Sequence, residues 1–407
     1  MFRGDDGALV AIAALAVLLA HRALLPGWAR RADGPDPLQL AQGPVGAGVD
    51  DLQVGDHVVV EPYIVRDDVD EPGTGPIAFG SMAYSRRSET ESVLVVPEVV
   101  VGRRGGLAWV TTTTTDATVP PADEPLTPQP APTSPGEVDF IDRDLDAPSW
   151  ALAVEEAVAR ISAGALDKVV LARAVQASAS RRIDPRWVLT RLAEDYDTTW
   201  VFAVDGLVGA TPEMLVRLER GLVTSRVLAG TIRRTGDDSH DLALAGSLAR
   251  SSKDLEEHEY AVRSVADALA AHTSSINVPD SPFVLHLNNV MHLATDVAGV
   301  VDDRSTSLAL AASLHPSAAV CGTPTRDADD VIAELEQMDR GRYAGPVGWM
   351  DASGDGEWGI ALRCGWYESA QSLRLYAGCG IVAGSVAADE VAESIAKLLP
   401  MRTALGG

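Results

Sequence analysis

The sequence predicts an α+β fold, and three features of the 407-residue chain carry this prediction. Residues 50–116 hold runs of β-branched residues separated by Gly, Pro and Asp, as in a β-rich segment. After a Pro-rich stretch, helical and strand-like segments follow one another without regular strand–helix–strand alternation. Short strands joined by tight turns fill much of the last part of the chain. These patterns favour antiparallel sheets over a doubly wound parallel sheet.

The first elements have clear local signals. Runs rich in Val, Ile and Thr predict strands within 56–65, 92–102 and 106–115. The segment 120–135 is Pro-rich and predicts an extended linker or surface loop. The segment 148–163 has the apolar spacing of an amphipathic helix. A helix over 184–196 opens with Asp184 and Pro185, the residue types of an N-cap and a first helical position.

The remaining elements follow the same rules. Apolar and β-branched runs predict strands at 168–175, 199–204, 215–218, 222–228 and 283–300. Helical patterns predict one long helix over 238–271 and further helices over 327–339 and 387–399. The segment 351–357, DASGDGE, predicts a tight hairpin turn inside a meander of strands.

Three parts are expected along the chain: a dispensable N-terminal extension (1–40), a β-rich part of the fold ending in the Pro-rich loop (41–137), and a catalytic domain (138–407). The extension contains an apolar run at 8–20, which is too short to span a bilayer. We therefore expect no stable membrane association.

Composition narrows the class of protein. The net charge of −25 argues against a nucleic-acid partner, because phosphate binding needs a basic surface. The three cysteines, Cys321, Cys364 and Cys379, form no CxxC pair, which favours a reducing compartment and a cytoplasmic enzyme. We expect a monomer that acts on a small molecule.

Lysine is rare in this chain. Of 33 basic residues only Lys168, Lys253 and Lys397 are lysines, and the rest are arginines. An amine can lose its proton when it is desolvated, whereas a guanidinium cannot. Lysines kept in such a composition are candidates for positions that arginine cannot serve.

Several segments together resemble the chorismate-utilising enzymes, a family that includes isochorismate, salicylate, anthranilate and aminodeoxychorismate synthases. The matching segments occur in the family's order across about 147–402: DKVVLAR (167–173), GATPEMLVR (209–217), LAGTIRR (228–234), SKDLEEHEYAV (252–262), MHLATDVAG (291–299), LHPSAAVCGTP (314–324), RGRYAGPVGW (340–349), GIALRCG (359–365) and AGCGIVAGSVAADEVAESIAKL (377–398). The resemblance implies a single catalytic unit of two intertwined halves, with large antiparallel sheets and helices outside.

The resemblance also implies two proton-transfer residues. Lys168 would be the general base that deprotonates an attacking water, since relatives that use ammonia typically carry Gln at this position. A lysine must lose its proton for this role, which burial and nearby cations favour. Glu213 would be the general acid that protonates the departing C4 hydroxyl, which requires a carboxyl that stays protonated.

The family's metal is Mg²⁺, which prefers oxygen ligands. The resemblance implies that Glu257 and Glu393 bind it. Asp254 and Glu390 each lie three residues earlier on the same helix faces, so they are further candidate ligands.

Substrate contacts are implied for a wider set. Arg363 would bind a carboxylate bidentately, and glycines would let backbone N–H groups approach the substrate. The expected substrate-binding residues are Arg363, Tyr343, Gly378, Gly380, Lys397, His292, Ala319, Ala229 and Thr231. Ala229 stands where adduct-forming relatives place Lys, and Ala319 where pyruvate-eliminating relatives usually place Thr.

These positions imply a Mg²⁺-dependent isochorismate synthase that adds water at C2 of chorismate and expels the C4 hydroxyl. Two alternatives stay open: a salicylate synthase, which runs the same first step and then eliminates pyruvate, and a non-catalytic chorismate-binding relative. The product would feed either menaquinone or siderophore synthesis.

Overall fold

Two antiparallel sheets form the centre of the computed structural model, which describes residues 67, 69–104, 106–113, 129–287 and 290–406. The nine-stranded sheet has the order β11 (Thr273–Asn277), β13 (Val290–Val301), β10 (Leu222–Arg233), β9 (Met214–Glu219), β16 (Gly356–Ile360), β15 (Pro346–Asp351), β1 (Ile77–Ser81) and β2 (Val93–Val95), with β12 (Phe283–His286) beside β13. The seven-stranded sheet has the order β14 (Gly322–Thr323), β6 (Lys168–Ala179), β18 (Ser372–Ile381), β17 (Cys364–Ser369), β8 (Leu207–Thr211) and β7 (Trp200–Val204), with β5 (Val138–Arg143) beside β6. A separate hairpin joins β3 (Val99–Arg104) to β4 (Leu107–Thr112). The predicted α+β class is confirmed.

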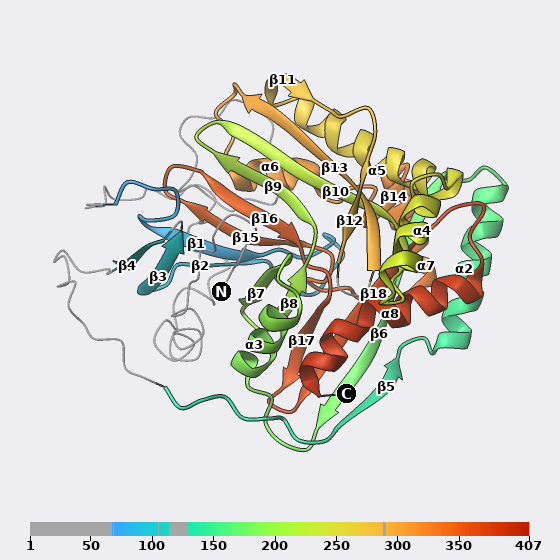
Figure 1. Cartoon of the computed structure of the whole chain (residues 1–407), viewed down its shortest axis with the longest axis horizontal. Coiled ribbons are helices and arrows are strands. Elements are labelled where there is room, and N and C mark those ends of the chain that lie inside the picture. Colours follow the sequence, from blue (N-terminus) through green and yellow to red (C-terminus); the bar gives the residue numbers. More distant parts are fainter. Residues whose placement is uncertain (1–66, 68, 105, 114–128, 288–289, 407) are drawn as a thin grey trace.

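Two of the connections at which the chain crosses between the two sheets lie next to each other. β8 and β9 follow each other in sequence but lie in different sheets, and so do β16 and β17 (Figure 1). The connections are hydrogen-bonded to each other: Ala210 N–H donates to the Arg363 carbonyl at 3.2 Å, and Ile360 N–H donates to the Glu213 carbonyl at 3.0 Å. The two halves are therefore intertwined, and Glu213 and Arg363 lie at the junction.

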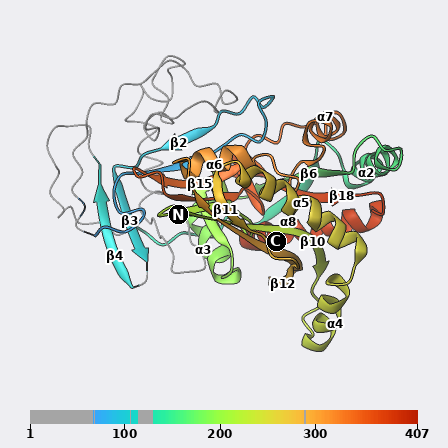
Figure 2. The ribbon, with the colours of Figure 1, turned by 90° about the horizontal axis from the view of Figure 1, so that it is seen from above.

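Helices pack on the outer faces of these sheets. They are α2 (Ala147–Ser162), α3 (Pro185–Asp195), α4 (Asp238–Leu248), α5 (Ser252–Ala270), α6 (Ser307–Leu314), α7 (Thr325–Leu335) and α8 (Ala387–Leu405). α5 packs on β10 and β13 of the large sheet, and α8 packs on β18 of the small one (Figures 1 and 2). The indole of Trp150 on α2 is fully buried and donates to the Ala172 carbonyl of β6 at 3.0 Å, which fixes this helix against its sheet.

The sequence prediction placed some helix ends wrongly. The single helix expected over 238–271 is two helices, because Ser251 accepts a hydrogen bond from Asp254 N–H and begins a new helix. The C-terminal helix continues through Pro400 and ends at Gly406, whose φ of 96° suits glycine. The helix at 184–196 is confirmed with its Asp184 N-cap, which accepts from Arg186 N–H.

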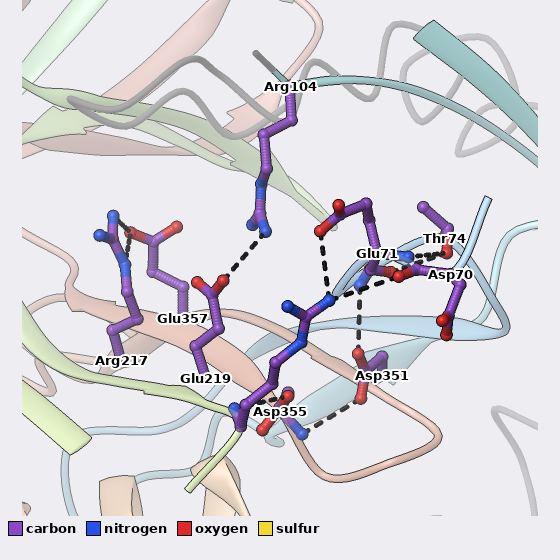
Figure 3. Close-up of polar contacts among 11 residues, drawn as sticks. Asp70, Glu71, Thr74, Arg104, Arg217, Glu219, Asp351, Asp355 and Glu357 are labelled. Atoms are coloured by element: carbon purple, nitrogen blue, oxygen red, sulfur yellow. Dashed lines mark hydrogen bonds and ion pairs between the residues drawn. The ribbon is translucent and has the colours of Figure 1, made fainter. Parts of the chain in front are cut away.

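The N-terminal part is integrated with the large sheet through β1, which pairs with β15. Polar contacts add to this (Figure 3): Gly73 N–H donates to Asp351 at 3.1 Å, and Glu71 lies 3.4 Å from Arg220. Residues 1–40 with their apolar run, the strand expected at 56–65 and most of the Pro-rich loop lie outside the described residues. Within the described ranges, no helix combines the length and apolarity needed to cross a bilayer.

Candidate active site

A pocket of about 590 Å³, its open mouth included, lies where the two sheets meet. Among the residues predicted for the site, those that line it are Glu213, Ala229, Thr231, Glu257, His292, Ala319, Tyr343, Arg363, Gly378, Gly380 and Lys397. Segments far apart in the sequence therefore converge on this pocket. The other residues predicted for the site are not among those that line it: Lys168, Asp254, Glu390 and Glu393.

Lys168 lies at the start of β6 and is fully buried, with 0% of its side chain exposed. Its Nζ is 3.3 Å from Glu257 Oε1 on α5 and has no hydrogen-bond partner among the described residues. Gly380 on the neighbouring strand makes room for this pair, because a Cβ there would lie 2.2 Å from Glu257 Oε1 and 3.2 Å from Lys168 Cε. The Lys168 amine is therefore enclosed by the protein, with the Glu257 carboxylate as its charged neighbour.

Glu213 follows Pro212 at the crossing from β8 to β9 and is 5% exposed. Burial raises the pKa of its carboxyl to about 7, although the charges of Lys168, Arg363 and Lys397 act in the opposite direction. A carboxyl with this pKa is largely protonated below neutrality, so it can donate a proton in the pocket.

Arg363 lies in the connection from β16 to β17, where the chain passes between the sheets, and its backbone has a φ of 47°. Its Nη2 is 3.5 Å from His292 Nε2, and His292 Nδ1 is 3.0 Å from Thr231 Oγ1. Burial and then the nearby Arg363 and Lys397 charges lower the pKa of His292 well below its usual range, so the ring is neutral. Because a guanidinium only donates, Nε2 must accept and Nδ1 must carry the proton.

The other cation of the pocket is Lys397 on α8. Its Nζ donates to the Gly378 carbonyl at 2.9 Å and lies 2.6 Å from Glu393 Oε1. Burial lowers the pKa of Lys397, but Glu393 and Cys379 together raise it further, so the net shift is upward and the amine stays charged. Tyr343 stacks on Tyr376, and a Cβ at Gly378 would lie 2.9 Å from the Tyr343 hydroxyl.

Carboxylates from two helices surround one point on β18. Burial raises the pKa of the Cys379 thiol well above its usual range, and the carboxylates of Glu393, Glu390 and Glu257 raise it further. Among the described residues, Cys379, Glu390 and Glu393 place potential ligand atoms within 4.8 Å of one another. Because the thiol stays protonated, the available donors are carboxylate oxygens, and this donor set fits Mg²⁺.

Two of the predicted ligands, Asp254 and Glu257, are not part of this group of ligand atoms among the described residues. The Asp254 Cβ packs against Gly230. Gly230 has a φ of 76° at a bulge in the pairing of β10 with β13, and a Cβ there would lie 3.0 Å from the Asp254 Cβ. This close approach lets the first turn of α5 lie against the pocket wall.

The sequence reasoning missed some residues of this wall. Gly230 was within the recognised LAGTIRR segment, but its role depends on a bulge that is visible only in the strand pairing. Arg340 also lines the pocket, and its guanidinium donates to the Glu336 carboxylate at 2.9 Å and to the Val170 carbonyl at 2.7 Å. Arg340 therefore holds the pocket wall together, and the recognised RGRYAGPVGW segment was its only signal.

A buried lysine, a protonatable glutamate and cationic groups around one pocket define an enzyme site for a small anionic molecule. The chain matches the family model described as chorismate binding enzyme over residues 50–406. It belongs to the chorismate-binding enzyme family.

Individual relatives agree with this assignment. Isochorismate synthase DhbC of Bacillus subtilis (strain 168) is 40% identical over 265 residues, which cover 62% of this chain and 66% of that one. Isochorismate synthase EntC of Escherichia coli (strain K12) is 37% identical over 258 residues, with the same two coverages. Both alignments span just under two thirds of the relative's length. The crystal structure of a putative 2,3-dihydroxybenzoate-specific isochorismate synthase, DhbC from Bacillus anthracis, has a TM-score of 0.69 and 34% identity, and the match covers 81% of this chain and 84% of that one.

Proposed function

We propose that this chain is a Mg²⁺-dependent isochorismate synthase that works as a cytoplasmic monomer. The observation that carries the proposal is the pairing of Lys168, buried without a hydrogen-bonding partner among the described residues, with Glu213, whose carboxyl has a pKa of about 7. The Lys168 charge acts on the Glu213 carboxyl, which lines the pocket. Such a pair suits a reaction that takes a proton from one oxygen and gives a proton to another.

The reaction begins with Lys168. Its neutral amine takes a proton from a water molecule while the water oxygen forms a bond to C2 of chorismate. Both ring double bonds shift, from C1=C2 to C1=C6 and from C5=C6 to C4=C5, and the C4–oxygen bond breaks. Glu213 gives its proton to the departing hydroxyl, which leaves as water. One water enters and one leaves, so the net change is an isomerisation.

Anion recognition rests on groups that keep their charge. Arg363 would bind one carboxylate of the substrate, oriented by the neutral His292 ring that accepts from it. Lys397 stays charged and contributes to the positive potential of the pocket. Gly378 and Gly380 leave space where a side chain would meet Tyr343 or Glu257.

A bound Mg²⁺ would supply positive charge at a substrate carboxylate. Glu257 and Glu393 would hold it. Among the described residues, Glu393 and Glu390 place potential ligand atoms within 4.8 Å of each other, whereas Glu257 lies outside that group. In its absence each of the first two carboxylates lies beside a lysine, Glu257 at 3.3 Å from Lys168 and Glu393 at 2.6 Å from Lys397.

Metal dependence is directly testable. We expect excess EDTA to abolish turnover and added Mg²⁺ to restore it. Glu257→Gln and Glu393→Gln each remove one negative charge at nearly constant shape, so each should lower activity by at least about 10²-fold. Loss of magnesium binding in isothermal titration calorimetry would accompany the loss of activity. Full turnover in excess EDTA would refute the metal assignment.

The product distinguishes the proposed reaction from its main rival, a salicylate synthase. Ala229 and Ala319 both line the pocket, so neither the lysine of adduct-forming relatives nor the threonine of pyruvate-eliminating relatives is present there. With chorismate as the only substrate, we expect chromatography to show isochorismate and a coupled lactate dehydrogenase assay to show no pyruvate above the uncatalysed rate. Stoichiometric pyruvate would establish the salicylate synthase reaction instead. No turnover at all, with chorismate still bound, would favour a non-catalytic relative.

A further inference from the structure

His258 is a polar residue on the otherwise apolar buried face of α5. It is 3% exposed and shares this face with Ala261, Val265 and Leu269, which pack in the core of the large sheet. Its Nε2 forms a 2.7 Å hydrogen bond with Thr295 Oγ1, and Thr295 is 2% exposed. The buried face of α5 is therefore held by a hydrogen bond at His258 in addition to its apolar packing.

The two strands under α5 lie beside the His258 ring. Thr295 belongs to β13, and the backbone of Ala229 on β10 lies close enough to the ring to raise its pKa, although His258 Nδ1 has no hydrogen-bond partner among the described residues. Ala229 lines the pocket. The imidazole therefore ties α5 to β13 beside the pocket wall, at the position next to Glu257.

Glu257 depends on the rotation of α5 about its axis. Consecutive helical residues point about 100° apart, so fixing His258 against the sheet fixes the direction in which Glu257 projects. A side-chain end about 6 Å from the axis moves by about 2 Å when the helix turns by about 20°. Apolar packing tolerates small rotations better than a directional hydrogen bond does. Glu257 Oε1 lies 3.3 Å from Lys168 Nζ, a spacing that such a movement would disrupt.

We propose that Thr295 and His258 are positioning residues that set the direction of the Glu257 carboxylate and thereby the affinity of the site for a divalent cation. This inference rests on the proposed metal-binding role of Glu257. Neither residue touches the substrate or the cation in this scheme, so the expected effect is on metal affinity.

Thr295→Val and Thr295→Ser test the proposal. Valine keeps the shape and removes the hydroxyl, whereas serine keeps the hydroxyl. Mn²⁺ is the probe, and the dissociation constant is measured by electron paramagnetic resonance of the free ion, together with the Tm of the metal-free protein. We expect Thr295→Val to weaken Mn²⁺ binding about tenfold and Thr295→Ser to restore it to within about twofold, in line with the usual cost of losing a residue that orients a metal ligand.

Ser307→Ala is the matched control. Ser307 is fully buried on α6, and its Oγ accepts from Trp358 Nε1 on β16 of the same sheet at 3.2 Å. This substitution also removes a buried hydroxyl between a helix and the large sheet, so it should lower the Tm and leave the Mn²⁺ dissociation constant unchanged. Equal weakening by Ser307→Ala would overturn the positioning role, because the effect would then be general.

The outcomes separate this inference from the proposed function. If the unaltered protein binds Mn²⁺ and Thr295→Val binds it equally tightly, the inference is overturned and the proposed function is not affected. A failure of the unaltered protein to bind Mn²⁺ would overturn the proposed metal site and the inference with it.

Discussion

Replacing Lys168 with arginine is expected to abolish isochorismate formation. Arginine keeps the positive charge and much of the length, but a guanidinium does not give up its proton under these conditions. Loss of a general base typically lowers the rate by about 10²–10⁴-fold, and we expect a loss in that range. The measurement is steady-state turnover of chorismate across pH 6–9, together with chorismate binding by calorimetry, which should persist.

Two further variants sharpen this test. Lys168→Gln removes both the charge and the base, and added ammonium salt should give slow formation of an amino product, because ammonia is its own base. Lys253→Arg makes the same exchange at a lysine to which we assign no function, and it should keep full activity. Near-normal turnover by Lys168→Arg at every pH would mean that Lys168 acts only through its charge and that the water is activated elsewhere.

Replacing Glu213 with glutamine is expected to lower turnover by a similar factor of about 10²–10⁴, because an amide cannot supply the proton that the leaving hydroxyl needs. The unaltered enzyme should lose activity as the pH rises through about 7, since the proton leaves the Glu213 carboxyl over that range. The pH profile of kcat/KM measures this descending limb. The residual kcat/KM of Glu213→Gln should not fall as the pH rises through about 7.

The same substitution should affect stability with a defined sign. The folded-state pKa of Glu213, about 7, lies above its usual value near 4.5, so the unfolded chain gives up this proton first as the pH rises. The unaltered protein therefore loses stability between about pH 4.5 and pH 7. Thermal unfolding should show a higher Tm for Glu213→Gln than for the unaltered protein at pH 8, and a much smaller difference at pH 4.5.

A Glu213→Gln variant that keeps its activity and the descending limb of the pH profile would refute the general-acid role.

The sequence predicted the class of fold because its signals were local. Asp184 and Pro185 are the residue types that begin a helix, and α3 begins at Pro185 with Asp184 as its N-cap. The break between α4 and α5 was missed although residues 250–254, RSSKD, interrupt the apolar spacing and Ser251 and Asp254 have the spacing of a helix-capping signal. The path of the chain from one sheet to the other at Glu213 and Arg363 could not be read from spacing, since it depends on pairing between distant strands.

The candidate site could be predicted as a set of residues but not as a geometry. The family resemblance named Lys168, Glu257 and Gly380 separately. Their mutual contact comes from three elements distant in sequence, β6, α5 and β18, and only tertiary packing brings them together. The neutral state of His292 likewise follows from burial beside Arg363, which no local pattern encodes.

Single turnover in ¹⁸O-labelled water tests the central claim most directly. If Lys168 activates a solvent water that attacks C2 while Glu213 releases the C4 hydroxyl, mass spectrometry of isochorismate should show one ¹⁸O atom, located at C2. Single-turnover conditions prevent the reverse reaction from spreading the label. Isochorismate without ¹⁸O would contradict the account, because the hydroxyl would then have moved within the substrate and no water would have been activated.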